Sequence, residues 1–205
     1  MPIDRAQRRR VAVFIDYQNC YGYARRSFCA PSDPSIAGQI LPRALAHFLA
    51  GKSRAGYDLV YCGVYCGIAA STREPRTYAA RRKQAAAWER AGATVVMRPL
   101  RYQGWPAERP REKGVDVRLA IDVVAKALAG DYDTAIIASC DTDVAPAVEL
   151  LLELRATHGK PDVELISWEG FQTKLGVAGQ RLTYREVTRT DFDAVSDPVD
   201  YNVRP

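Results

Sequence analysis

Five short, unbroken apolar runs are spaced along the chain, and helix-forming segments lie between them. The runs are residues 11–16 (VAVFID), 59–65 (LVYCGVY), 94–100 (TVVMRPL), 134–139 (TAIIAS) and 163–168 (VELISW). A run that is continuous rather than alternating is typical of a strand buried on both faces. Strands that alternate with helices predict an α/β fold, in which helices cover both faces of a parallel sheet.

The segments between these runs divide into helices and loops. We expect helices at residues 35–50, 77–91, 115–129 and 144–156. Pro42 should kink the first helix or break it into two pieces. The stretch 17–34 is polar and aromatic and receives no assignment, and residues 101–112 are expected to form a loop because they contain one glycine and two prolines. The length of 205 residues fits one domain, with residues 188–205 as a loosely held C-terminal tail.

Cysteine content and hydropathy predict a cytoplasmic protein. The five cysteines are odd in number and form no disulfide framework, so most should be small buried hydrophobes. No apolar run approaches the roughly 20 residues of a membrane helix, and the N-terminus lacks the apolar stretch of a secretory signal. We therefore expect no association with membranes.

Acidic side chains follow the apolar runs at several places. Asp16 ends the first run with Asn19 three residues later, Asp141 and Asp143 follow the fourth, and Asp116 lies in the first turn of the helix expected at 115–129. Ligands of open parallel sheets bind outside the carboxyl ends of the strands. Carboxylates gathered there would repel one another unless a hard divalent cation offset their charge. The pattern predicts an Mg²⁺ or Mn²⁺ site, and two ions about 4 Å apart could clamp the reacting oxygens of a phosphodiester.

Each acidic residue also has a simpler explanation. Asp16, Asp141 and Asp143 could cap helices or turns, and the helix dipole favours Asp116 in a first turn. Asp122 lies about 240° around the helix from Asp116 and is expected off the cluster. Convergence of three separate segments is what favours a shared site.

The middle of the chain is basic. Between Arg73 and Lys113, eleven Lys or Arg residues stand against four Asp or Glu, a surplus of seven within a net charge of +5. This predicts a polyanion partner, although a solvated helix face and a mobile loop would explain individual arginines. The candidate RNA-binding residues, including two aromatics that could stack on unpaired bases, are Arg81, Arg82, Lys83, Arg98, Arg101, Arg109, Arg111, Tyr102 and Trp105.

Two segments resemble a known family. VAVFIDYQNCY is similar to the opening of an NYN domain, and KGVDVRLAIDVVAKALAGDYDTAIIASCDTDVAPAVELLLELRATHGKPDVELISW is similar to its second half. The resemblance covers about residues 10–187 and includes the LabA-like branch of this group of PIN-like nucleases. Two positions depart from the family pattern: Cys140 replaces a glycine and Val144 an aromatic residue. A glycine needed for a positive φ would make Cys140 strained.

The resemblance implies a Rossmann-like three-layer sandwich with a five- or six-stranded, mostly parallel sheet and a metal-dependent endoribonuclease site. Its implied metal ligands are Asp16, Asp116, Asp141 and Asp143. Asn19 would orient Asp16 or the substrate, and the second-tier residues are Lys113, Ser139 and Asp122. The leading hypothesis is therefore hydrolysis of RNA, with single-stranded RNA as the partner. An RNA-binding or regulatory module with a weak or inactive site is the alternative, a phosphatase or 5′-nuclease a third, and a homo-oligomer is left open.

Overall fold

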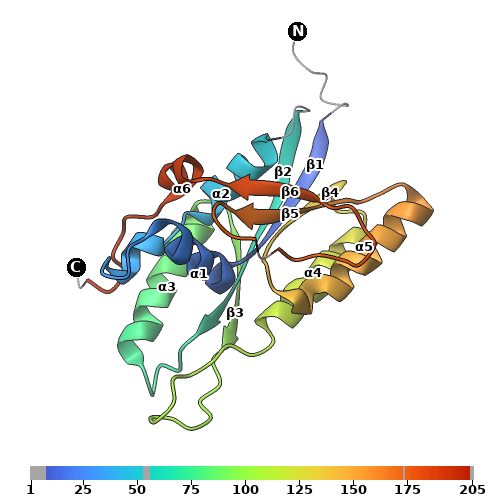
Figure 1. Cartoon of the computed structure of the whole chain (residues 1–205). Helices are drawn as coiled ribbons and strands as arrows, with labels where there is room; N and C mark the ends of the chain where they lie inside the picture. Colours follow the sequence, from blue (N-terminus) through green and yellow to red (C-terminus); the bar gives the residue numbers. More distant parts are fainter. Residues whose placement is uncertain (1–7, 53–55, 173, 204–205) are drawn as a thin grey trace.

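The computed structural model describes residues 8–52, 56–172 and 174–203 and shows one six-stranded sheet (Figure 1). All neighbouring strands are parallel, in the order β3-β2-β1-β4-β5-β6. The strands are β1 (Arg9–Asp16), β2 (Tyr57–Ile68), β3 (Thr94–Pro99), β4 (Thr134–Ala138), β5 (Asp162–Trp168) and β6 (Thr183–Val187). The predicted three-layer α/β sandwich is confirmed, with six strands.

Helices cover both faces of this sheet. The helical elements are α1 (Tyr17–Phe28), η2 (Ser35–Gly38), α2 (Pro42–Gly51), α3 (Pro75–Arg90), α4 (Val115–Leu128), η3 (Thr142–Val144), α5 (Ala145–His158) and α6 (Arg189–Val195). In Figure 1, α4 and α5 lie together on one side of the sheet, and α1, α2, α3 and α6 lie on the other.

The central strand shows why its sequence is apolar throughout. Val13 and Ile15 of β1 point into the core shared with α1, α2 and α3, whereas Ala12 and Phe14 point into the core shared with α4 and α5. All four side chains are fully buried. Alternate residues of a strand face opposite sides, so a strand between two helical layers must be apolar at every position.

Pro42 breaks the expected helix at residues 35–50 rather than kinking it. The first piece is the short 3₁₀ helix η2, and α2 begins at Pro42 itself. Proline is well suited to the first position of a helix, because the N–H it lacks would have no partner there.

Helix α1 occupies a stretch that the sequence left unassigned. Its buried residues are Tyr17, Cys20, Ala24 and Phe28, spaced three or four apart as on one face of a helix. The Asp16 carboxylate accepts a hydrogen bond from the Asn19 N–H and caps the helix. Tyrosine and cysteine on the buried face concealed this periodicity.

The sequence predicts a loosely held tail from residue 188, but the structure shows an ordered segment there. Thr188 and Asp191 form a reciprocal capping box at the start of α6. Phe192 and Val195 are buried, and the Phe192 ring stacks on Phe28 with centroids 5.1 Å apart. The segment therefore completes the core beside α1, and the domain boundary at residue 187 stays a prediction.

Two further expectations concern cysteines and membranes. All five cysteines are free, and four of them are buried, as predicted. Within the described parts of the chain, none of the helices combines the length and the apolar character that crossing a membrane requires.

Replacing Phe192 with alanine tests the packing of α6. The change removes a buried aromatic ring, so we expect the free energy of unfolding to fall by about 3–5 kcal/mol. Urea denaturation measures this loss. Val199→Ala, at a side chain 48% exposed, is the matched control and should change stability by less than about 0.5 kcal/mol. A Phe192→Ala protein as stable as the control would contradict the packing.

Candidate functional site

The strand order reverses between β1 and β4, which are direct neighbours in the sheet. β1 leads outward to β2 and β3, and β4 leads to β5 and β6 in the opposite direction. In open parallel sheets, ligands bind outside the carboxyl ends of the two strands at such a reversal, and we call this place the crevice. Asp16 is the last residue of β1, and Ser139 directly follows β4.

Hydrogen bonds join the two sides of this crevice. The Ser139 hydroxyl donates to Asp16 Oδ2 at 3.4 Å and accepts from the Asp141 N–H at 3.1 Å. The Asn19 side-chain oxygen accepts from the Cys140 N–H at 3.0 Å. Asn19 and Ser139 therefore fix the turn after β4 against the first turn of α1.

Two of the predicted acids do cap local structure. Asp16 Oδ1 accepts from the Asn19 N–H at 3.1 Å, and Asp141 Oδ1 accepts from the Asp143 N–H at 3.0 Å. Each cap uses one carboxylate oxygen; the other oxygen of Asp16 accepts from Ser139, and an ionised carboxylate still has lone pairs for another role. Capping and site functions are thus compatible. Asp143 itself is exposed.

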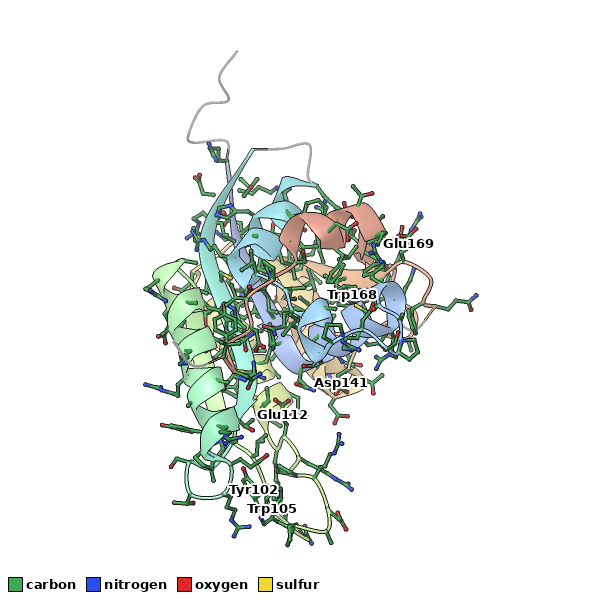
Figure 2. The ribbon with its side chains drawn as sticks, turned by 90° about the vertical axis from the view of Figure 1, so that its left-hand side faces the viewer. Tyr102, Trp105, Glu112, Asp141, Trp168 and Glu169 are labelled. Carbon is green, nitrogen blue, oxygen red and sulfur yellow. The ribbon has the colours of Figure 1, made fainter. Side chains whose placement is uncertain are left out.

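Glu112 is an acid of this site that sequence reasoning missed. Its side chain folds back to accept a hydrogen bond from the Gly67 N–H at the end of β2. A Cβ at Gly67 would lie 2.7 Å from Glu112 Oε1, so glycine is required for this approach. In Figure 2, Glu112 lies between Asp141 and the loop that carries Tyr102 and Trp105. Its position just before Lys113 and Gly114, in the loop that leads to Asp116, was the available signal.

Electrostatics link the acids into a row. Burial raises the pKa of Asp16 to about 7, and the charges of Glu112 and Asp141 add to this rise against hydrogen bonds from Asn19 and Ser139. Burial also raises the pKa of Glu112, with a further contribution from Asp116 and an opposing one from Arg81. Asp16 thus interacts with Asp141 and Glu112, and Glu112 interacts with Asp116; we call these four acids the acidic row.

The donor chemistry of this region fits a hard divalent cation, since the acidic row offers carboxylate oxygens and the adjoining Asn19 and Ser139 offer an amide and a hydroxyl oxygen. Among residues 8–52, 56–172 and 174–203, no three His, Cys, Asp or Glu side chains are close enough to form a complete ligand set. Mg²⁺ commonly uses only one or two carboxylates and keeps several waters. The arrangement suits that mode of binding better than a cage of protein ligands.

The two predicted acids of helix α4, Asp116 and Asp122, lie in different surroundings. Asp116 is in the first turn, next to Glu112 in the row. Asp122 instead accepts a hydrogen bond from the Tyr65 hydroxyl and pairs with Arg118, each at 3.0 Å. These partners occupy Asp122 outside the row of acids. Lys113 is exposed and precedes Gly114, which is the N-cap of α4 and has a positive φ of 71°.

The loop between β3 and α4 gathers part of the predicted basic surface. Arg101 and Arg111 pair through their backbones and close it as a hairpin. The rings of Tyr102 and Trp105 meet edge to face at 5.4 Å, and the Tyr102 hydroxyl donates to Glu74 at 2.6 Å. A hollow at the hairpin is lined by the cations Arg101, Arg111 and Lys113 and by the acids Glu108 and Glu112, so these cations border the acidic row.

The other predicted cations are spread over neighbouring elements. Arg98 on β3 and Arg109 in the hairpin are exposed. Arg82 and Lys83 are exposed on α3, and the Lys83 ammonium donates to the Val203 carbonyl at 3.3 Å. Arg81, on the same helix, is half-buried beside Tyr17. Of the three α3 cations, Arg81 is the one whose charge acts on the acidic row.

The two departures from the family pattern cause no backbone strain. No non-glycine residue in the described part of the chain has a positive φ, so Cys140 tolerates its turn. Both Cys140 and Val144 are buried in the hydrophobic cores. Their side chains therefore contribute to packing rather than to the crevice.

Comparison with known proteins gives a family and a fold. The model of one family, described as the NYN domain, matches residues 10–175. A crystal structure of a protein of unknown function from Vibrio parahaemolyticus is similar at a TM-score of 0.52 with 18% sequence identity, covering 95% of this chain and 93% of the other. This likeness bears on the fold alone. A search of curated proteins gave no match.

The raised pKa of Asp16 predicts how stability depends on pH without metal. This carboxyl titrates near 3.8 in an unfolded chain and at about 7 in the folded one. Between these values the folded state holds the extra proton, so the contribution of Asp16 to stability falls as pH rises toward 7 and is lost above it. The difference in free energy of unfolding between Asp16→Asn and the parent should therefore shift in favour of the variant by on the order of 2–3 kcal/mol from pH 5 to pH 8.

Urea denaturation in EDTA at both pH values measures this gain. Asp193→Asn, an exposed carboxyl on α6, is the control and should show the same difference from the parent at both. A pH-independent difference for Asp16→Asn would contradict the assigned environment.

Proposed function

The chain belongs to the NYN domain family, a group of PIN-like nucleases that act on RNA, and we propose that it is a divalent-cation-dependent endoribonuclease. The observation that carries the proposal is the buried Asp16 carboxylate at the topological switch point, in a row with Asp141 and Glu112. On the resemblance of VAVFIDYQNCY and of the segment from Lys113 to Trp168, we further propose that the chain belongs to the LabA-like branch.

The cation would be held by Asp16 and Asp141 with Asp116, Asp143 and Glu112 around them, directly or through water. When bound, Mg²⁺ or Mn²⁺ would supply positive charge that offsets the carboxylates and polarises the phosphodiester. The chain contributes orientation, because Asn19 and Ser139 hold the turn of Asp141 against Asp16. Buried and hydrogen-bonded groups of this kind keep a site in its productive geometry.

Single-stranded RNA is the proposed substrate. The hairpin between Arg101 and Arg111 extends beyond the sheet at its carboxyl edge (Figure 2) and presents cations next to Glu112. Trp105 is 36% exposed and can stack on an unpaired base. Phosphates drawn to these cations would reach the acidic row without crossing another element.

An RNA-binding module with a weak site is the second candidate. The observation in its favour is that the described carboxylates do not form a complete ligand set by themselves. The unstrained turn at Cys140 removes one reason for expecting an inactive protein. Tight binding of RNA without cleavage in Mg²⁺ or Mn²⁺ would select this candidate.

Loss of either acid at the crevice should stop catalysis. Because removing even supporting groups of a metal site costs about 10–100-fold, Asp16→Asn and Asp141→Asn should each lower Mn²⁺-dependent cleavage of a labelled single-stranded RNA by about a hundredfold or more. Asp58→Asn, at the amino end of β2, is the control and should retain parental activity. Circular dichroism checks folding. Parental cleavage by both crevice variants would remove the proposal.

Charge removal from the hairpin should weaken RNA binding and its salt dependence. The double variant Arg101→Ala/Arg111→Ala should lower the slope of log affinity against log salt by about 0.7 for each phosphate that an arginine no longer neutralises. Fluorescence anisotropy between 50 and 300 mM KCl, in EDTA, measures the slope. Arg155→Ala, at a cation that pairs with Asp162 at the other end of the strands, should leave it unchanged. Equal slopes for the double variant and the parent would exclude the hairpin from the RNA surface.

A further inference from the structure

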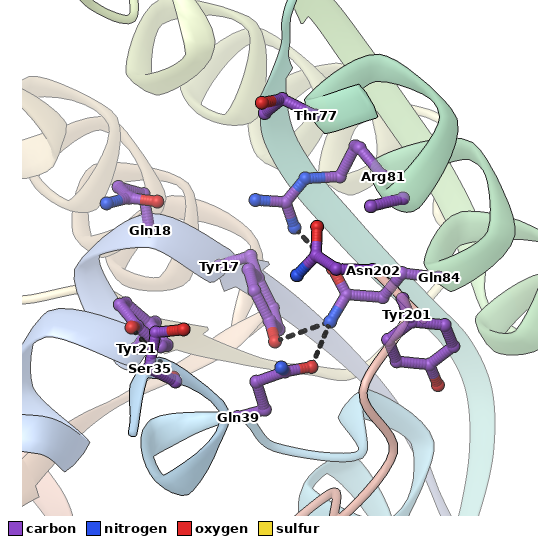
Figure 3. Close-up of a pocket in the computed structure, with 11 residues that line it drawn as sticks. Tyr17, Gln18, Tyr21, Ser35, Gln39, Thr77, Arg81, Gln84, Tyr201 and Asn202 are labelled. Atoms are coloured by element: carbon purple, nitrogen blue, oxygen red, sulfur yellow. Dashed lines mark hydrogen bonds between the residues drawn. The ribbon is translucent and has the colours of Figure 1, made fainter. Parts of the chain in front are cut away.

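A cavity of about 240 Å³ lies beside the acidic row, between α1, η2, α3 and the C-terminal segment (Figure 3). Its volume is below the roughly 300–1,000 Å³ of sites for drug-sized ligands, so it suits one small planar group. Aromatic and amide side chains dominate its lining, among them Tyr17, Tyr21, Tyr201, Gln18, Gln39 and Asn202. None of the described residues that line it carries a carboxylate.

A chain of hydrogen bonds fixes the floor of this cavity. Gln84 is buried, and its side-chain nitrogen donates to the Tyr17 hydroxyl at 3.1 Å and to Gln39 Oε1 at 2.7 Å. Its oxygen accepts from Arg81 at 2.7 Å. Figure 3 shows Gln84 between Tyr17, Gln39 and Arg81. These bonds set the direction of the Gln39 amide and leave its NH₂ group available to a ligand.

Arg81 connects the cavity to the acidic row. Its guanidinium lies 5.2 Å above the Tyr17 ring, and Tyr17 directly follows Asp16. The positive charge of Arg81 lowers the pKa of Glu112 against the effect of burial. Within the described chain Arg81 makes no ion pair within 4 Å. A cation held on an aromatic face, with donors to spare, is suited to a phosphate.

The C-terminal segment supplies one wall. The Tyr201 hydroxyl donates to the buried Asp197 carboxylate at 2.9 Å, and the Asp197 N–H donates to the Gln39 carbonyl at 2.9 Å. This anchors the segment beside Gln39. The residues expected to form a loose tail thus help to form this cavity.

We propose that this cavity takes one unpaired nucleobase of the RNA, with the adjoining phosphate on Arg81 at the entrance to the acidic row. The inference rests on the proposed function and assigns it a base-recognition subsite. Unpaired bases are recognised by stacking on aromatic rings and by hydrogen bonds to their edges, and the cavity provides tyrosines and amides for both. No described lining residue is a carboxylate, so no acidic side chain lies at the surface of the walls.

The test measures binding of fluorescein-labelled RNA hexamers in EDTA, where cleavage does not interfere. The probes are the four homopolymers and a set with one abasic nucleotide at each position in turn. For the parent we expect one position at which loss of the base weakens binding about tenfold. We also expect a preference among the four homopolymers.

Gln39→Leu and Gln18→Leu keep side-chain size but remove the amides, and should reduce the base preference to less than about twofold. Tyr201→Ala opens the wall from the C-terminal segment and should cost about tenfold in affinity for the preferred hexamer. Gln180→Leu, at an exposed glutamine of the loop before β6, is the matched control and should bind as the parent does. Circular dichroism checks that each variant is folded.

Parallel cleavage assays with Mn²⁺ separate the two proposals. If the parent cleaves RNA while all three cavity variants keep its base preference and affinity, the subsite is wrong and the proposed function stands. If the parent shows the base preference and the variants lose it, but nothing is cleaved, the subsite stands and the nuclease proposal fails. No measurable binding of any hexamer by the parent would overturn the subsite.

Discussion

The burial of one carboxylate at the end of the central strand is the constraint on which the site depends. Asp16 lies at the carboxyl end of β1, beside β4, where the chain leaves the two strands toward opposite halves of the sheet. The residue is buried, with 6% exposed. A charge in that position is costly without compensation, and the charges of Asp141 and Glu112 increase the cost. The fold holds Asp16 there because it also caps α1 and accepts from Ser139. Under the proposed function, a bound divalent cation would complete the compensation.

The surroundings of Asp16 divide the site into two sides. On the side of β2, Gly67 allows Glu112 to fold inward, and Arg81 partly offsets its charge. On the side of β4, backbone and side-chain hydrogen bonds hold Asp141 in place. The basic hairpin and the cavity beside Tyr17 both border the first side. Under the proposed function, RNA drawn to the cations would reach Asp16 from the direction of β2.

The C-terminal segment has a larger part in this arrangement than its composition indicates. The sequence predicts a loose tail there, yet α6 packs Phe192 against Phe28, and beyond it Tyr201 lines the cavity and is anchored by Asp197. Helix α6 buries two side chains, Phe192 and Val195. A pattern that short is too weak to distinguish from a coil, and it is the partner surface on α1 and α2 that makes it helical and ordered.

The sequence by itself determined the layered fold and the residues at the ends of its central strands. Continuous apolar runs such as residues 11–16 can be buried only between two layers, so the parallel sheet, and with it the approach of Asp16 to Asp141, could be predicted from local pattern. Tertiary structure alone decided the place of Glu112, Arg81 and Tyr201. They reach the site or the neighbouring cavity from a hairpin, a helix face and the far end of the chain, and their approach depends on contacts between segments distant in sequence. Periodicity records which face of an element is buried, but it carries no information about which distant side chain lies opposite.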